Sequence, residues 1–201
     1  MSGLITRHLA RQSKLPGAEE AFISGMFRNI GEHLTLYYFP EEHADIKAYM
    51  SEHQTTMAAA ARRVLGITFS ELGASVARAW KLPGPILEVI EASPDGGPMP
   101  SAAPEDALRN LAVFANELCA IPGTDDTAPQ NDAMRRLCAR FAVSVRIDGA
   151  TAYRVLEGAL EKFRQFAPIL GINPGRSEFC RDLEQWLAWW HTEAQVNVSG
   201  A

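Results

Sequence analysis

The sequence has few cysteines, and none of them is placed for a metal site or a disulfide framework. Cys119, Cys138 and Cys180 are the only cysteines among 201 residues, and they are widely spaced without a CxxC pair. An odd number of isolated cysteines disfavours both structures. We therefore expect free, buried thiols in a reducing cytoplasm.

Long apolar runs and excess positive charge are missing as well. No stretch has the ~18 consecutive apolar residues typical of a membrane-spanning helix. The opening residues, MSGLITRH, lack the apolar core of a signal peptide. The formal net charge of −5 gives nucleic acid no overall electrostatic attraction. These features predict a cytoplasmic protein with no membrane or nucleic-acid partner.

Known catalytic loops are also absent. The sequence has no GxSxG nucleophile elbow and no P-loop or dinucleotide-binding glycine motif. The run Asp95-Gly96-Gly97-Pro98 is typical of a turn rather than of a phosphate cradle. Nothing in the sequence thus supports a nucleophile or a phosphate loop, and no cofactor is expected.

What the sequence does contain is helical periodicity over most of its length. Apolar residues make up 47% of the chain, enough for a substantial core, and no segment alternates apolar and polar residues over strand length between turn signals. The fold class is therefore predicted to be all-α. The expected helices cover about 4–12, 18–38, 40–53, 55–65, 68–81 and 86–92, and helices continue after residue 104.

A single helix is expected over 18–38, because apolar residues recur there at spacings of three and four: Ile23, Phe27, Ile30, Leu34 and Tyr37. Gly25 and Gly31 interrupt it, and each costs about 1 kcal/mol relative to alanine in a helix. Two such glycines predict close packing or a bend.

Two other helix starts carry local signals. Pro40 suits the first position of a helix, and acidic residues follow it. Thr68 and Glu71 have the spacing of a capping box.

The clearest boundary is rich in proline and glycine. Residues 93–104 contain four prolines and two adjacent glycines. The predicted division is a helical core over 1–93, a linker over 94–104, a C-terminal helical extension over 105–194 that could form a second small subdomain, and a disordered tail over 195–201.

Two runs resemble the HDOD family, the HD-related output domain of bacterial signalling proteins. The first is EAFISGMFRNIG at 20–31; the second is LGITFSELG at 65–73, followed by AWKLP at 79–83. The resemblance covers about residues 4–92 and corresponds to the second, C-terminal half of the domain. The later helices look like the extension of HDOD proteins that accompany kinase modules. The resemblance implies an HD-like helical bundle with a role in signal transduction.

The departures from an active HD enzyme are informative. In such enzymes a His-Asp pair holds a divalent metal that generates hydroxide, and here the pair is replaced by Arg28 and Asn29. An arginine cannot deprotonate to become a ligand. Thr68 and Phe69 stand where relatives often have Asp-His, and 91–94 replaces a histidine pair. The resemblance thus implies a pseudoenzyme without a metal.

The remaining candidates surround this former pocket. Possible anion contacts are Arg28, Asn29, His33, Arg62 and Arg63. The simpler interpretation of the basic residues, Arg78 and Lys81 included, is ion pairing with Glu71, Glu88 and Glu91. His33 is expected to be satisfied and partly buried, with a position facing the pocket as the alternative. His8 lies near the place of an early HD-family histidine, whereas His43 and His53 are expected to be solvated.

Three tryptophans lie within five residues near the C-terminus. Trp186 and Trp190 share a helix face and are expected to pack inward. Trp189 lies off that face and could contact a partner or a second copy, and half-buried packing is an equal alternative.

These observations leave three hypotheses. The leading one is a non-catalytic HDOD-type regulatory module that contacts a protein partner in a bacterial, kinase-linked pathway, with homodimerisation left open. The alternative is a degenerate HD pocket that senses a nucleotide or another anion. The third is a metal-dependent phosphohydrolase with unusual ligands.

Overall fold

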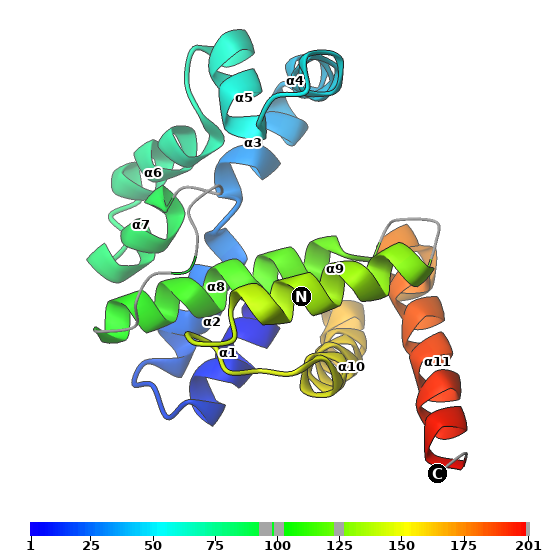
Figure 1. Cartoon of the computed structure of the whole chain (residues 1–201). Helices are drawn as coiled ribbons and strands as arrows, with labels where there is room; N and C mark the ends of the chain where they lie inside the picture. The colour runs from blue at the N-terminus through cyan, green and yellow to red at the C-terminus, as the bar shows by residue number, and fades with distance from the viewer. Residues whose placement is uncertain (93–97, 99–102, 123–126, 200–201) are drawn as a thin grey trace.

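The computed structural model describes residues 1–92, 98, 103–122 and 127–199, with side chains described except at 127–129 and 193–199. Within these residues the fold is all-α and has no β-strand, as predicted (Figure 1). The elements are α1 (Ser2–Gln12), α2 (Ala18–Phe27), α3 (Ile30–Tyr38), α4 (Pro40–His53), α5 (Met57–Leu65), α6 (Phe69–Ala79), α7 (Gly84–Glu91), α8 (Pro104–Ala120), α9 (Thr127–Arg140), α10 (Gly149–Phe166), the 3-10 turns η1 (Ala167–Leu170) and η2 (Pro174–Arg176), and α11 (Glu178–Ser199).

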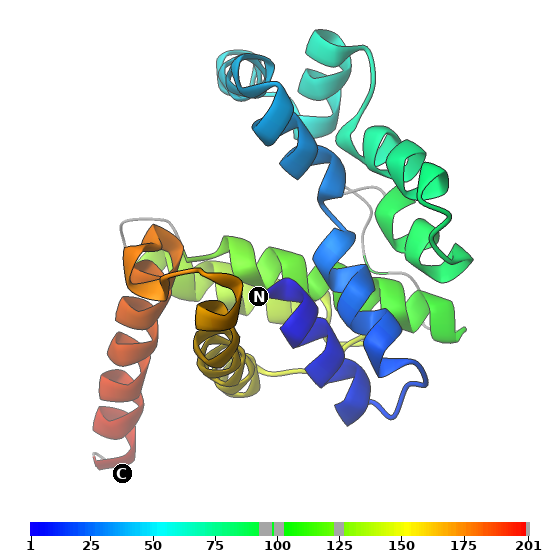
Figure 2. The same ribbon diagram turned by 180° about the vertical axis from the view of Figure 1, so that it is seen from behind.

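The helices form two groups that meet at α2, α7 and α8. Helices α1, α2 and α8 to α11 make the lower group, and α3 to α7 make the upper group (Figures 1 and 2). The chain passes between the groups at residues 28–29, where α2 ends and α3 begins. A pocket described below lies at this junction.

The main core belongs to the lower group. Ile5 and Leu9 of α1 are buried together with Leu111 and Phe114 of α8. The same core includes Trp186 of α11. The predicted division of the chain at 94–104 remains a prediction, because most of that segment lies outside the described residues, and the core takes side chains from both sides of it.

The upper group has two smaller cores. One contains Ala74 and Ala77 of α6 with Ile86 and Ile90 of α7. The other contains Ile46 of α4 with Ala60 and Ala61 of α5. Their small residues let the short helices approach closely. The last turn of α3 keeps its large side chains exposed.

The single helix predicted over 18–38 is wrong, because the chain forms two helices with a turn at Arg28 and Asn29. The Gly25 carbonyl accepts hydrogen bonds from Asn116 Nδ2 at 3.0 Å and from Ser2 Oγ at 2.9 Å. These side chains satisfy the carbonyl near the end of α2, where the helix stops.

Close packing at the two glycines of this region is confirmed. A Cβ on Gly25 would lie 2.1 Å from Thr6 Oγ1 of α1, and a Cβ on Gly31 would lie 1.9 Å from the Phe69 carbonyl oxygen of α6. Neither gap admits a side chain, so α2 and α3 each contact a neighbour through backbone.

Both predicted helix starts are confirmed. Pro40 is the first residue of α4. Thr68 and Glu71 form the reciprocal capping box at the start of α6, with Thr68 N donating to Glu71 Oε2 at 2.8 Å and Glu71 N donating to Thr68 Oγ1 at 3.2 Å.

The C-terminal helix differs from the sequence-based boundary. Helix α11 continues to Ser199 and so includes residues 195–199, which the sequence analysis assigns to a disordered tail. The cysteines are free, with Cys138 and Cys180 buried and Cys119 partly buried. In the described part of the chain, no helix has the length and apolar character that a bilayer crossing requires.

Candidate functional site

Arg28, which the resemblance places at the position of the HD histidine, is buried and serves as a helix cap. Its side chain is only 6% exposed. Its Nη2 donates to the Ala92 carbonyl oxygen at 2.7 Å, and its Nη1 donates to the Ile90 carbonyl oxygen at 3.4 Å. These carbonyls lie at the C-terminal end of α7, which has no further turn to satisfy them and attracts positive charge. The guanidinium therefore ties the α2–α3 turn to the end of α7.

The charge on Arg28 is only partly compensated. Among the ion pairs of the described residues, none joins Arg28 to a carboxylate. Burial, and then the nearby Arg109, lower the pKa of Arg28 to about 10. The side chain still carries its proton at neutral pH, so a cation is held inside the fold by backbone dipoles.

Arg28 and Asn29 line a pocket at the junction of the two helix groups, named here the central pocket. Its volume is about 400 Å³. Its wall combines the α2–α3 turn, the starts of α5 and α6, and the facing sides of α8 and α9: Arg28, Asn29, Glu32, Met57, Phe69, Ser70, Val113, Asn116, Glu117, Ala120 and Arg140. The pocket thus lies where the resemblance places a former active site.

The central pocket is balanced in charge. Glu117 of α8 forms an ion pair with Arg140 of α9. Glu32 Oε1 lies 3.5 Å from His43 Nε2, and Arg28 is held by carbonyls. Two arginines and two glutamates therefore face one cavity, together with the neutral amides of its wall. Such a wall suits a small polar group better than a free dication.

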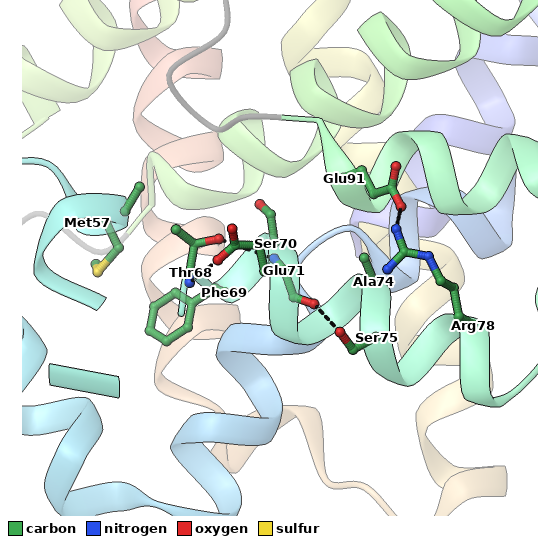
Figure 3. Close-up of a pocket in the computed structure, with 10 residues that line it drawn as sticks. Met57, Thr68, Phe69, Ser70, Glu71, Ala74, Ser75, Arg78 and Glu91 are labelled. Atoms are coloured by element: carbon green, nitrogen blue, oxygen red, sulfur yellow. Dashed lines mark hydrogen bonds and ion pairs between the residues drawn. The ribbon is translucent and has the colours of Figure 1, made fainter. Parts of the chain in front are cut away.

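A second pocket, named the α6 pocket, shares Met57, Phe69 and Ser70 with the central pocket. Its volume is about 420 Å³. Figure 3 shows Arg78 of α6 reaching Glu91 of α7 across its far end, and the capping box closing the near end. Arg78 is thus paired across helices, in agreement with the simpler interpretation of the basic residues.

The other predicted pocket residues lie elsewhere. Arg62 Nη2 donates to Glu71 Oε1 at 2.6 Å on the surface. Arg63 is exposed, and neither arginine lines the central pocket. His33 is also exposed, so the expectation that it is partly buried or faces the pocket is wrong. Gly31 and Thr35 form the buried side of α3, and His33 lies between them on the opposite side.

The histidines are spread over the fold. His43, expected to be solvated, is instead 5% exposed and stacks on Phe69, with the ring centroids 6.2 Å apart. His43 lies between α4 and α6. The acidic residues around it in the sequence indicated a solvated side chain, but the packing of these two helices buries it. His53 is exposed, as expected. Burial, then Lys162 and Arg11, lower the pKa of His8. The described residues include no group of three or more His, Cys, Asp and Glu side chains that could hold a metal ion.

The tryptophan cluster packs mainly inward. Trp186 is 1% exposed and donates Nε1 to Asn131 Oδ1 at 3.1 Å. Trp190 stacks on Tyr153, with the ring centroids 4.7 Å apart. Trp189 is half-buried against the main core. Of the two alternatives for Trp189, half-buried packing is the one that the structure shows. Only the exposed part of its ring could contact a partner.

Sequence reasoning missed the part of the central pocket that comes from α8 and α9. Asn116, Glu117 and Arg140 approach Arg28 only because the lower group folds under the α2–α3 turn. Their separation from residue 28 is too large for a local motif. The one available signal is Asn116, a polar residue directly after the buried Ala115 in a largely apolar part of α8.

Comparison with known proteins finds a family match for residues 1–95. Neither the curated proteins nor the solved structures contain a match. A family model does match, and it covers α1 to α7 together with the turn that carries Arg28 and Asn29. This confirms the resemblance found in the two sequence runs. Residues 1–95 thus form an HDOD domain.

Proposed function

We propose that this protein is a non-catalytic regulatory module of the HDOD type that acts by contacting another protein in a bacterial signalling pathway. The observation that carries the proposal is the role of Arg28. A side chain in the place of a metal ligand donates to the Ile90 and Ala92 carbonyls and so belongs to the scaffold. A guanidinium offers no lone pair to a metal.

The catalytic part of this proposal is tested by a phosphoesterase assay. The purified chain is incubated with Mn²⁺ or Mg²⁺ and with mono- and diester substrates, beside the variant Asn29→Ala. We expect no turnover above the metal blank from either protein. Hydrolysis by the wild type that is lost in Asn29→Ala would overturn the proposal, because it would place chemistry in the central pocket.

The contact part is tested by quantitative capture of partners from the native cell extract, using wild type and Trp189→Ala. Since Trp189 is half-buried, the unfolding midpoint of the variant is measured alongside to separate lost binding from lost folding. We expect one or more proteins to be captured in stoichiometric amounts. The proposal of a protein partner fails if the wild type captures none.

Sensing of an anion is the second candidate, favoured by one specific observation. Arg28 is a buried cation on the wall of a pocket of about 400 Å³ and has no carboxylate partner among the described residues. A thermal-shift series with inorganic phosphate, nucleotides and cyclic dinucleotides tests it. A ligand at ~100 times its Kd should add about 2.7 kcal/mol to the unfolding free energy.

The variants for that series are Arg140→Gln, which changes the wall of the pocket, and Arg63→Gln, an exposed arginine outside it. A stabilisation that disappears in Arg140→Gln and persists in Arg63→Gln would establish the sensor. Equal shifts in all three proteins would indicate nonspecific screening and would remove this candidate.

A further inference from the structure

The wall of the central pocket carries a positive and a negative side chain that do not bind each other. Arg28 and Glu32 both line the pocket, yet none of the ion pairs among the described residues joins them. The other two charged residues of the wall, Glu117 and Arg140, are paired with each other. Once that pair is counted, one cation and one anion remain available on the wall.

The positive side of this wall has hydrogen-bond donors to spare. Arg28 donates to the Ile90 and Ala92 carbonyls, and these bonds leave part of the five-donor set of a guanidinium unused. Asn29, the next residue on the wall, makes no side-chain bond to α3, the helix that it precedes. Arg109 lies near Arg28 and is not part of the wall, so it adds positive charge from behind. A carboxylate is the group that such donors bind most strongly.

The negative side of the wall is Glu32, in the first turn of α3. Its Oε1 lies 3.5 Å from His43 Nε2, which is long for a hydrogen bond. Within the described part of the chain, no lysine or arginine forms an ion pair with it. The carboxylate of Glu32 therefore has capacity to accept hydrogen bonds from an ammonium group in the pocket.

Apolar side chains from both helix groups complete the wall. Met57 and Phe69 come from the upper group, and Val113 and Ala120 come from α8 in the lower group. The volume of about 400 Å³ is near the lower end of the range of about 300–1,000 Å³ that is typical of ligand pockets. The pocket thus suits one small molecule that has an apolar part, and such a molecule would touch both helix groups.

We propose that the central pocket binds a free α-amino acid with an apolar side chain, as the zwitterion. Its carboxylate binds Arg28 and Asn29, its ammonium group binds Glu32, and its side chain packs on the apolar part of the wall. A simple anion would place a second negative charge beside Glu32, and a simple cation would place a second positive charge beside Arg28. A molecule that carries both charges avoids either repulsion. This inference rests on the sensing candidate above and deepens it, because it names a zwitterion rather than an anion as the ligand.

Isothermal titration calorimetry of the full chain with L-leucine, L-methionine and L-phenylalanine tests the proposal. Each amino acid is compared with two analogues that lack one charged group and add no bulk: the deaminated acid, such as 3-phenylpropanoate, and the decarboxylated amine, such as 2-phenylethylamine. We expect saturable binding of at least one of the three amino acids. Both of its analogues should bind roughly tenfold more weakly or worse, since each leaves one charged side chain of the wall without its partner.

The variant Glu32→Gln removes the negative charge and keeps the size of the side chain. It should weaken binding of the amino acid roughly tenfold or more and leave binding of the deaminated acid unchanged or stronger. Glu41→Gln is the matched control, because Glu41 is exposed and lies outside the pocket wall, and it should bind the amino acid as the wild type does. Circular dichroism verifies that both variants fold.

Three outcomes would overturn the inference: no binding of any of the three amino acids, equally tight binding of the deaminated acid by the wild type, or unchanged binding of the amino acid by Glu32→Gln. The thermal-shift series described above separates this failure from failure of the sensing candidate. If phosphate or a nucleotide stabilises the chain and Arg140→Gln abolishes the effect while no amino acid binds, sensing of an anion stands and the zwitterion is wrong. If neither kind of ligand binds, both fail.

Discussion

At the scale of single residues, Arg28 shows how a buried charged side chain can hold two helices together. A metal-binding pair would need lone pairs directed at a shared point. The guanidinium instead presents donors, and α7 ends nearby with carbonyl groups that need them. Burial of the charge is tolerated because these donors are used, and the pKa of about 10 keeps the group protonated.

Replacing Arg28 by methionine keeps the length of the side chain and removes its donors. We expect Arg28→Met to lower the free energy of unfolding by about 1–3 kcal/mol, since two buried carbonyls lose their partner. Urea denaturation followed by circular dichroism measures the change. Arg63→Met is the matched control, because Arg63 is exposed, and it should stay within about 0.5 kcal/mol of wild type. Equal stability of the two variants would contradict the capping role.

Glu71 gives a residue-scale prediction about pH. The hydrogen bond from the Thr68 backbone, followed by the one from Arg62, lowers the pKa of Glu71 below its ordinary 4.5. A carboxylate whose pKa is lowered by folding adds stability above its unfolded pKa, and this contribution is lost as the pH falls through the folded pKa. We expect Arg62→Gln to raise the pKa of Glu71, so that the loss begins at higher pH.

Carbon-13 NMR titration of the Glu71 carboxyl measures that pKa directly. Arg63→Gln removes a neighbouring charge without removing the hydrogen bond, and it should leave the titration nearly unchanged. If both variants moved the pKa equally, the effect would be long-range charge rather than the contact at 2.6 Å between Arg62 and Glu71.

At the scale of elements, local signals predicted helix starts well. The first position of α4 and the capping box of α6 both depend on residues within one turn of each other. The break between α2 and α3 could not be predicted in this way. The break is accompanied by hydrogen bonds to the Gly25 carbonyl from Ser2, 23 residues away, and from Asn116, 91 residues away along the chain. Once the break is missed, the helical phase beyond it is wrong, and this explains the incorrect placements of His33 and Tyr37.

The same limit applies to the candidate site. Arg28 and Asn29 were found because the two runs fix their place in the domain. Glu117 and Arg140 were not found, because they enter the central pocket only through tertiary packing of α8 and α9. Arg62 and Arg63 are close in sequence to the expected region, but they extend from α5 into solvent. The two sequence runs thus predicted the pocket residues better than closeness along the chain did.

The spacing of α3 and α6 provides the element-scale prediction. A Cβ at Gly31 would meet the backbone of Phe69, which cannot rotate aside. We expect Gly31→Ala to lower the free energy of unfolding by about 1–3 kcal/mol, near the upper end of that range, because the added methyl group overpacks the contact. Gly158→Ala is the control, because nothing lies within 4 Å of its Cβ position in α10. That change should raise stability by about 0.5–1 kcal/mol, since glycine is a weak helix former.

Thermal or urea unfolding of both glycine variants measures the two stability changes. The opposite signs follow from packing alone, since each substitution adds the same methyl group to a helix. Stabilisation by Gly31→Ala would mean that α3 and α6 can separate freely, and the close contact would then have no role in holding the upper group together.

At the scale of the whole molecule, the shared core links the HDOD domain to the helices that follow it. Ile5, Leu9 and Ala21 are buried in one cluster with Leu111 and Phe114. A fragment ending at residue 92 would return the first three to water. Burial of a large aliphatic side chain is worth about 1.5–3 kcal/mol, and folded domains are stable by only about 5–15 kcal/mol.

We therefore expect residues 1–92 alone to lack a cooperative unfolding transition. Differential scanning calorimetry and the dispersion of amide signals in NMR spectra measure this. The control is the full chain with a short Gly-Ser insertion after Pro98, which should unfold cooperatively because lengthening a connection costs little. Adding residues 103–199 as a separate fragment should restore the transition of 1–92. A sharp transition from 1–92 alone would show instead that the upper group and α1–α2 are self-sufficient, and that the shared core adds stability without being required for folding.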